Sequence, residues 1–319
     1  MPLGNVKLEN MVGLKMTEYN LIFGDALVEL KKLPDSSVDL IVADPPYNLG
    51  KDYGKTKDNL EKNEYLEFSK EWLAECNRLL KPNGSIYIFM GIRYISYIYH
   101  ILEDDLGLDF QNWIVWHYTQ GLGKKKGFSS RHDDILVFSK GSNPKFNLDD
   151  IRIPQKFYRK INNMRGANPG NVWEFSHVHY CNENRQNHPT QKPEGLIERI
   201  VLASSDENDV VLDPFSGSGT TLRVCQQLNR NGIGIEIHQE YVDLTHDRLS
   251  KEFNGFDSID PRMERVPFDL RDSEIREEYL RNHEHWFLKN HPDSVEKFRK
   301  EVKKLYEVSK VKPKQKELF

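Results

Sequence analysis

Cysteine and long apolar runs are both scarce in this sequence. The three cysteines, Cys76, Cys181 and Cys225, are far apart and odd in number, so they form neither a disulfide framework nor a pair with metal-ligand spacing. This use of cysteine predicts a reducing, intracellular location, and we expect a cytoplasmic protein. No apolar run reaches the length of a membrane span, and the first 20 residues lack the apolar core of a signal peptide. We therefore expect no contact with a membrane.

An overall excess of positive charge is also lacking. The 319 residues include 45 Lys and Arg against 49 Asp and Glu, which gives a net charge of −4 and excludes a polycation that binds nucleic acid over its whole surface. The charge is uneven, however, because residues 124–165 hold 11 basic and 4 acidic side chains. Such a segment fits a local site for a polyanion. The simpler alternative is a solvated face rich in loops.

Strand-like and helical patterns alternate along most of the chain. Strands are expected at the apolar runs NLIF, VDLIVA, SIYIFM, NWIVWHY, DDILVFSK, DVVLD and GIGIEI. Helices are expected at residues 26–33, 63–81, 193–205, 219–229 and 238–253, the second of them stopping at Pro82-Asn83-Gly84. The run VDLIVA lacks polar alternation, which is typical of a parallel strand buried on both faces. The order of elements predicts an α/β fold with a doubly wound, mainly parallel sheet.

Three segments depart from this pattern. Residues 48–62 are polar and rich in Lys and Asp, which predicts a mobile loop. Residues 141–187 have no clean period. From about residue 255 the chain changes to two charged helices and a Lys-rich tail. We expect these helices to dock on the same molecule rather than to form a separate DNA-binding module.

The stretch VVLDPFSGSGTT, residues 210–221, reads as a strand, a glycine loop and a helix. Glycines let a ligand approach the backbone, and a helix N-terminus offers N–H groups, although packing alone explains such a loop equally well. The next strand ends in Glu236, an acid placed to hold two ribose hydroxyls. The lysine of a nucleoside-triphosphate loop is missing, which disfavours that class of ligand.

Three other polar residues stand close to expected elements. Asp25 follows a strand, where capping of the helix that starts at Ala26 is the simpler explanation. If the sheet binds a nucleoside, Asp25 is placed to accept a hydrogen bond from an adenine amino group. Lys192 precedes a helix and is placed to reach a ligand carboxylate. His188 has no partners at metal-ligand spacing, so we interpret it as structural and expect no metal.

The corner DPPY, residues 44–47, joins an acid, two prolines and an aromatic ring at the end of an expected buried strand. An aromatic amine such as adenine N6 attacks poorly because its lone pair is delocalised into the ring. Asp44, with the Pro45 carbonyl as a second acceptor, would localise electron density on that nitrogen, and Tyr47 offers a face for the base. A plain proline turn is the simpler alternative, but it does not account for this combination.

Four motifs in this order, GDAL, DPPYN, HPTQKP and DPFSGSGTT, resemble the amino-methyltransferases of DNA, specifically the permuted β group of adenine-N6 enzymes from restriction–modification systems. The resemblance covers roughly residues 19–251. It implies a Rossmann-like sheet with one antiparallel edge strand, S-adenosyl-L-methionine as cofactor and double-stranded DNA with a flipped adenine as substrate. No covalent enzyme intermediate is needed. Cytosine-N4 enzymes more often carry serine in place of the aspartate of DPPY.

The same resemblance assigns roles residue by residue. The catalytic corner is Asp44, Pro45, Pro46 and Tyr47. The cofactor residues are Asp25, Ala26, Lys192, Asp213, Phe215, Ser216, Gly217, Ser218, Gly219, Thr220, Glu236 and Ile237. DNA contacts are expected from Lys124, Lys125, Lys126, Arg131, Lys156, Arg159, Lys160 and Arg165, with Gln120, Asn162, Asn163 and Asn182 added as candidates for base edges.

The resemblance also divides the chain and names its partners. Residues 1–116 correspond to the catalytic half, 117–187 to the target-recognition region, 188–254 to the cofactor half and 255–319 to a helical extension. A cognate restriction endonuclease and a homodimer are the implied partners. The alternatives are a cytosine-N4 enzyme, an RNA or protein amide methyltransferase, and a catalytically inactive DNA-binding subunit.

Overall fold

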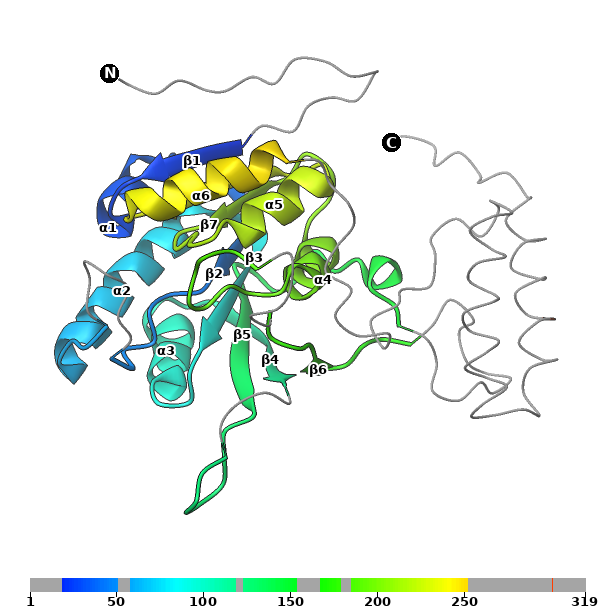
Figure 1. Cartoon of the computed structure of the whole chain (residues 1–319). Helices are drawn as coiled ribbons and strands as arrows, with labels where there is room; N and C mark the ends of the chain where they lie inside the picture. The colour runs from blue at the N-terminus through cyan, green and yellow to red at the C-terminus, as the bar shows by residue number, and fades with distance from the viewer. Residues whose placement is uncertain are drawn as a thin grey trace, which may run out of the picture. The chain divides into compact units, whose positions relative to one another are not determined.

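The structure is a computed structural model that describes residues 19–50, 58–118, 123–153, 167–178 and 185–251, together with Lys300. Over these ranges the chain forms an eight-stranded sheet in the order β1-β8-β7-β2-β3-β5-β4-β6 (Figure 1). The strands are β1 (Tyr19–Phe23), β2 (Val38–Ala43), β3 (Leu80–Met90), β4 (Asp109–His117), β5 (His132–Ser139), β6 (Val172–Glu174), β7 (Val210–Asp213) and β8 (Asn231–Glu236).

The sheet is parallel except at β5, which pairs antiparallel with both β3 and β4. The other neighbouring pairs in the described sheet are parallel. The prediction of a mainly parallel sheet is confirmed, but the expected position of the antiparallel strand at the edge is wrong. Strand β5 follows β4 in the chain and pairs antiparallel with it. In the sheet, β5 lies between β3 and β4.

Helices form a layer on each face of the sheet. They are α1 (Ala26–Glu29), continued by the 3-10 turn η1 (Leu30–Lys32), α2 (Lys62–Leu79), α3 (Ile95–His100), continued by the π-helical turn η2 (Ile101–Asp105), α4 (Glu194–Ser204), α5 (Thr220–Gln227) and α6 (Gln239–Ser250). Ile86 and Ile88 of β3 join the core cluster that contains Trp72 of α2. Tyr87 points to the other face, where its hydroxyl lies 2.8 Å from Ser204 Oγ of α4. This alternation along β3 separates the layer of α2 from the layer of α4.

Helix α2 ends earlier than the sequence predicts. It stops at Leu79, and residues 80–84, including Pro82-Asn83-Gly84, already belong to β3. Leu80 is already extended, with ψ 132°, and Pro82 disfavours helical backbone at Lys81, so the helix does not continue. Leu80 pairs with Val38 and Ser85 with Leu40, which leaves an irregularity that takes up the intervening residues.

Other segments also differ from their expected structure. Helix α3 was not expected, although its buried residues Ile95 and Ile98 have helical spacing. The three-residue strand β6 lies inside the segment that lacks a clean period. The polar segment 48–62 is anchored at its ends, because the Asp58 carboxylate accepts the N–H of Asn48 at 2.6 Å and of Leu49 at 3.0 Å. The mobility expected for this segment stays a prediction, and residues 51–57 lie outside the described ranges.

A second compact unit comprises Leu148–Pro169 and Pro261–Phe319. Its described part contains the 3-10 turn η3 (Leu148–Asp150), an Arg152–Asp149 ion pair of 2.6 Å and a bridge between Ile153 and Ala167. The helices expected after residue 255 lie outside the described residues, apart from Lys300. None of the helices in the described part of the chain is both long and apolar enough to cross a membrane.

Candidate active site

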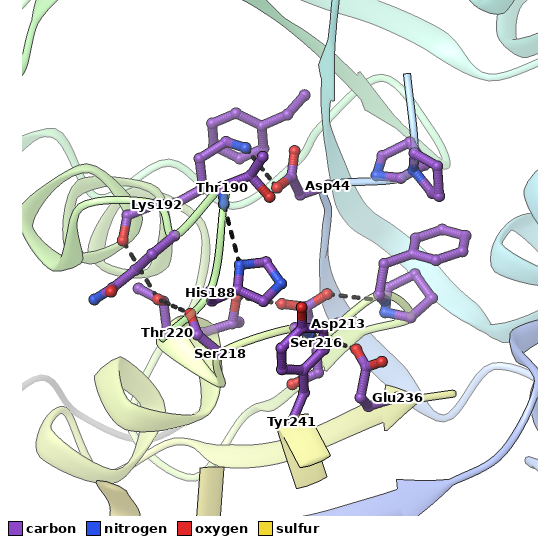
Figure 2. Close-up of a pocket in the computed structure, with 18 of the residues that line it drawn as sticks. Asp44, His188, Thr190, Lys192, Asp213, Ser216, Ser218, Thr220, Glu236 and Tyr241 are labelled. Atoms are coloured by element: carbon purple, nitrogen blue, oxygen red, sulfur yellow. Dashed lines mark hydrogen bonds and ion pairs between the residues drawn. The ribbon is translucent and has the colours of Figure 1, made fainter. Parts of the chain in front are cut away.

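A cavity of about 680 Å³ lies where the parallel strands β2, β7 and β8 end. Its walls come from the residues after these strands, from the start of α1 and from residues 185–192. Figure 2 shows Asp44, Asp213 and Glu236 around this space, each from a different strand end. The carboxyl edge of a doubly wound sheet is where such folds bind ligands. Most of the predicted site residues therefore line one cavity.

The DPPY corner follows β2 and is held by one contact within the corner and by contacts from α2 and from the segment before α4. The Tyr47 hydroxyl donates to Asp44 Oδ1 at 2.9 Å, and Lys192 Nζ lies 2.5 Å from Asp44 Oδ2. The Tyr65 hydroxyl of α2 donates to the Pro46 carbonyl at 2.8 Å. Each oxygen of the Asp44 carboxylate is therefore held by a side chain that lines the cavity.

Lys192 belongs to this corner. Its Nζ is 5.5 Å from the centroid of the Tyr47 ring and 5.3 Å from that of Phe89. The Lys192 side chain is only 11% exposed, and Asp44 is the carboxylate that it meets. The sequence predicts contact with a ligand carboxylate instead, and the two partners lie on segments too far apart in the chain for spacing to connect them.

The glycine loop begins at Asp213, the last residue of β7. Asp213 accepts the Thr221 hydroxyl at 2.6 Å and the Phe215 N–H at 3.1 Å. Burial raises the pKa of Asp213 to about 7, an effect that these hydrogen bonds oppose and the nearby charges of Asp44 and Glu236 reinforce. The group therefore titrates near neutral pH at the floor of the cavity.

Two glycines shape the loop between β7 and α5. Gly219 has φ +71°, and a Cβ there would lie 2.3 Å from Thr245 Cγ2 of α6. Gly217 has φ +49°, and its Cβ would lie 3.0 Å from Nε2 of His188. Both positions therefore require the left-handed backbone and the small volume of glycine.

Glu236 ties this loop to the end of β8. Its two carboxylate oxygens accept the N–H groups of Gly217 and His238, both at 2.8 Å. Burial raises its pKa above the usual value. Across the cavity, Asp25 accepts the Leu27 N–H at 2.8 Å and so caps α1, while it also lines the cavity together with Ala26 and Ile237. Asp25 therefore caps α1, as the simpler explanation holds, and also lines the cavity.

One buried hydroxyl in the cavity wall lacks a partner. Ser216 is 5% exposed, and its Oγ makes no hydrogen bond within the described structure. A buried polar atom without a partner calls for an explanation, such as a ligand. Together with the carboxylates of Asp25 and Glu236, it forms a set of donors and acceptors that fits the amino group and ribose hydroxyls of a nucleoside.

His188 lies in the cavity wall, although the sequence was interpreted as giving it a structural role alone. Burial lowers its pKa to about 4, so the imidazole is neutral at physiological pH. Its Nδ1 accepts the N–H of Thr190 at 3.3 Å, and its ring packs edge-on against Tyr241 with centroids 4.5 Å apart (Figure 2). It positions the HPTQKP segment against the glycine loop.

Sequence reasoning missed several other lining residues. They are Phe89, Asp133, His177, Arg185, Thr190, Gln191 and Tyr241. Thr190 and Gln191 belong to the quoted motif HPTQKP, so the motif itself carried a signal for them. The rest come from strands, helices and loops that tertiary folding brings to the cavity.

The predicted DNA contacts fall partly outside the described chain. Lys124, Lys125 and Lys126 are exposed in the loop between β4 and β5, and Arg131 is half-buried at its end. Lys156, Arg159, Lys160, Arg165, Gln120, Asn162, Asn163 and Asn182 lie outside the described residues.

Cys76 and Cys225 are buried free thiols, and Cys181 lies outside the described residues. Across the described ranges, groups of three or more potential metal-ligating side chains are absent.

Comparison with known proteins places the chain in a family. The DNA methylase family that groups N6 and N4 methyltransferases matches residues 38–247. The Type II methyltransferase M.HpaI of Haemophilus parainfluenzae is 64% identical over 292 residues, 91% of this chain and 92% of that protein. The DNA adenine methyltransferase YhdJ of Escherichia coli K12 is 42% identical over 243 residues, 72% of this chain and 82% of that protein.

Among solved structures, the complex of M1.HpyAVI with S-adenosylmethionine has a TM-score of 0.53 and 28% identity, covering 73% of this chain and 100% of that one. The predicted methyltransferase fold, the DNA substrate and the cofactor S-adenosyl-L-methionine are thereby confirmed. The chain belongs to the DNA methylase family.

Proposed function

We propose that this chain transfers a methyl group from S-adenosyl-L-methionine to N6 of a flipped adenine at a specific site in double-stranded DNA. The observation that carries the proposal is the Asp44 carboxylate, held at the cavity by the Tyr47 hydroxyl and Lys192. Aspartate in the DPPY corner supports adenine over cytosine. The 42% identity to a DNA adenine methyltransferase supports the same choice.

The glycine-loop side of the cavity is the proposed cofactor site. S-adenosyl-L-methionine supplies an electrophilic methyl group on a sulfonium centre. Glu236 is proposed to accept hydrogen bonds from the ribose hydroxyls, and Asp25 is proposed to accept one from the adenine amino group. The Ser216 hydroxyl would gain a hydrogen-bond partner. Asp213, Phe215, Gly217, Ser218 and Thr220 complete this wall, while Gly219 shapes the loop from behind it, against Thr245. Lys192 retains the predicted contact with the cofactor carboxylate as an alternative to its ion pair with Asp44.

The DPPY side is the proposed pocket for the target base. N6 inside a duplex is paired and stacked, so the adenine must leave the helix before it meets the methyl group. Asp44 and the Pro45 carbonyl accept hydrogen bonds from the amino group, which localises electron density on the attacking nitrogen. Tyr47 stacks on the base. Methyl transfer would form the bond from N6 to the methyl carbon as the bond from that carbon to the sulfonium sulfur breaks. The sulfur would leave as a neutral thioether and the amino group would release a proton to solvent, so no enzyme nucleophile is required.

A nucleoside analysis of methylated DNA tests this proposal. Plasmid DNA is incubated with the protein and S-adenosyl-L-methionine, digested, and the modified nucleosides are separated by mass. We expect N6-methyladenine, and long-read sequencing of the same DNA fixes the target motif. N4-methylcytosine would support the second candidate, which the inclusion of both reactions in one family favours. Preference for an RNA competitor would support an RNA methyltransferase.

The Asp44→Ala variant tests the assigned chemistry. Removal of an oriented acceptor is expected to lower kcat about a hundredfold or more, while cofactor binding measured by calorimetry persists. Asp109→Asn, which changes an exposed aspartate at the start of β4, serves as the control. A normal rate in Asp44→Ala would contradict the mechanism. Intact cofactor binding without methyl transfer in the unmodified protein would support an inactive DNA-binding subunit.

We further propose the β-group order of halves, with 1–116 catalytic, 117–187 target-recognising, 188–254 cofactor-binding and 255–319 a helical extension. The recognition segment also contributes β5 and β6 to the sheet. A cognate restriction endonuclease, a homodimer and a location in the cytoplasm belong to the same proposal. The 64% identity to a Type II methyltransferase supports the link to a restriction enzyme, and sedimentation velocity tests the dimer.

A further inference from the structure

Phe128 is the most exposed large apolar side chain among the described residues, with a relative exposure of 100%. It lies in residues 123–131, which we call the β4–β5 loop. In Figure 1 this loop extends away from the ends of β4 and β5. A single exposed apolar side chain needs no explanation on its own. The shape of the loop and the charges around Phe128, however, indicate which kind of ligand the side chain would meet.

The β4–β5 loop has local features that set its shape. Gly127 has φ +82°, which turns the chain immediately before Phe128. The Ser129 hydroxyl accepts the N–H of Lys124 at 2.8 Å, and this hydrogen bond joins the two sides of the loop on either side of Gly127. The ring of Phe128 is therefore presented outside a short closed turn, fully exposed and without an apolar neighbour to pack on among the described residues.

The charge of the same loop fits a polyanion. Lys124, Lys125 and Lys126 are all exposed and directly precede Gly127 and Phe128. The stretch 123–132 contains no acidic residue. Three lysines beside an aromatic ring repel a second copy of the same loop but attract a phosphate backbone. The arrangement combines phosphate-contacting cations with an apolar group of the kind that enters between bases.

The loop also starts and ends beside the proposed target pocket. Strand β4 runs antiparallel to β5, which is antiparallel to β3, so β4 ends at the same sheet edge as β2 and β3. On the return side, Asp133 of β5 lines the cavity and is five residues from Phe128. DNA bound by the lysines is thereby brought to the side of the sheet where Asp44 receives its substrate.

We propose that Phe128 is a wedge that inserts into the duplex beside the target adenine and stabilises the extruded state of that base. The proposal rests on the function proposed above. Extrusion costs the stacking and pairing of one nucleotide, and an inserted aromatic ring replaces part of the lost stacking. Phe128 is thus a positioning residue for the reaction and does not touch the reacting atoms.

The test compares Phe128→Ala with the unmodified protein on two duplexes that carry the mapped target motif. In one, the target adenine is paired with thymine; in the other, it faces an abasic site, so that extrusion is easier. We expect Phe128→Ala to lower kcat/KM about tenfold to a hundredfold on the paired duplex and less than about twofold on the abasic one. Phe128→Trp should retain most of the rate, because the larger ring stacks similarly.

Phe146→Ala is the matched control, since Phe146 is 54% exposed outside this loop. A second readout replaces the target adenine with 2-aminopurine, whose fluorescence rises on unstacking. The rise on protein binding should be smaller for Phe128→Ala than for the control.

Three outcomes would overturn the wedge. They are an unchanged rate of Phe128→Ala on the paired duplex, an equal loss on both duplexes, and dissociation of a dimer by the substitution in sedimentation velocity. Failure of the proposed function looks different, because the unmodified protein would then form no N6-methyladenine on either duplex.

Discussion

At the scale of single residues, the ion pair between Lys192 and Asp44 connects two motifs that are 148 positions apart in the chain. Its geometry gives Lys192 a role in orienting the catalytic carboxylate. We predict that Lys192→Met lowers kcat about tenfold to a hundredfold, because Asp44 loses one of its two fixed contacts. The KM for S-adenosyl-L-methionine should change less than about threefold. Steady-state kinetics with varied cofactor at saturating DNA measure both.

The control for this variant is Lys145→Met. Lys145 also lies between aspartates, at 2.8 Å from Asp206 and 2.5 Å from Asp209, but it does not line the cavity. Its loss should leave kcat unchanged. A large rise in KM for the cofactor with normal kcat in Lys192→Met would instead favour the contact with a ligand carboxylate.

Asp213 predicts a pH dependence of stability. Its folded pKa is raised by burial from 3.8 to about 7, so the unfolded chain loses its proton first as the pH rises. The stability linked to Asp213 is fully present below pH 3.8 and is lost as the pH rises through about 7. The free energy of unfolding of the unmodified protein, relative to Asp213→Asn, should therefore fall between these pH values and level off above them.

Urea unfolding of both proteins at steps from pH 4 to pH 9 measures this difference, with a limiting slope of about 1.4 kcal/mol per pH unit. Thr221→Val is the matched control. The Thr221 hydroxyl lowers the pKa of Asp213 by donating at 2.6 Å, so its removal should move the loss of stability to higher pH. Parallel pH profiles for the unmodified protein and Asp213→Asn would contradict the assignment.

At the scale of elements, the junction of the glycine loop with α5 and α6 depends on one position. Gly219 is the N-cap of α5 with φ +71°, and α6 leaves no room for a Cβ beside Thr245. Gly219→Ala is predicted to lower the free energy of unfolding by about 2–4 kcal/mol, from backbone strain and overpacking together. Denaturant unfolding measures the loss.

Gly107→Ala separates the two causes. Gly107 has φ +64°, and a Cβ there meets nothing within 4 Å. It should therefore cost only the backbone term, about 1 kcal/mol. Equal losses in the two variants would mean that packing of α5 on α6 does not require glycine at 219.

Elements with strong local patterns were predictable from the sequence. The strand, glycine loop and helix around Asp213 were foreseen because apolar runs and glycines mark them locally. The strand that ends at Asp44 was foreseen for the same reason. Strand β6 has three residues and depends on its pairing with β4, so its own sequence does not indicate a strand. The insertion of β5 between β3 and β4 is likewise a choice among tertiary pairings, which periodicity does not record.

The site was predictable to a similar depth. The carboxylates at strand ends were identified because parallel strands bring their carboxyl ends to one edge. The pairing of Lys192 with Asp44, the unpartnered Ser216 hydroxyl and the place of His188 in the wall were not. Each of these depends on distances between segments far apart in the chain, which only the folded structure supplies.

At the scale of the whole molecule, charge distribution matters more than total charge. With a net charge of −4, the protein as a whole repels DNA, so binding has to come from local basic segments. The β4–β5 loop is a basic segment within the described chain, it extends away from the ends of β4 and β5 (Figure 1), and Asp133, just after it, lines the cavity. Its three lysines, Lys124, Lys125 and Lys126, are expected to contact phosphates without reading sequence.

Replacement of these three lysines by glutamine should weaken DNA binding at all sequences and flatten its salt dependence. Each phosphate contact adds about 0.9 to the slope of log K against log salt, so the slope should decrease in magnitude by about two to three. Fluorescence anisotropy with a labelled duplex over a series of salt concentrations measures it. A control variant replaces Lys31, Lys32 and Lys251, which are exposed elsewhere, and loses the same total charge. Because phosphate contacts act locally and net charge does not, equal effects in both variants would show that the loop has no special role, whereas a flattened slope in the loop variant alone assigns the DNA contact to the segment that carries Phe128.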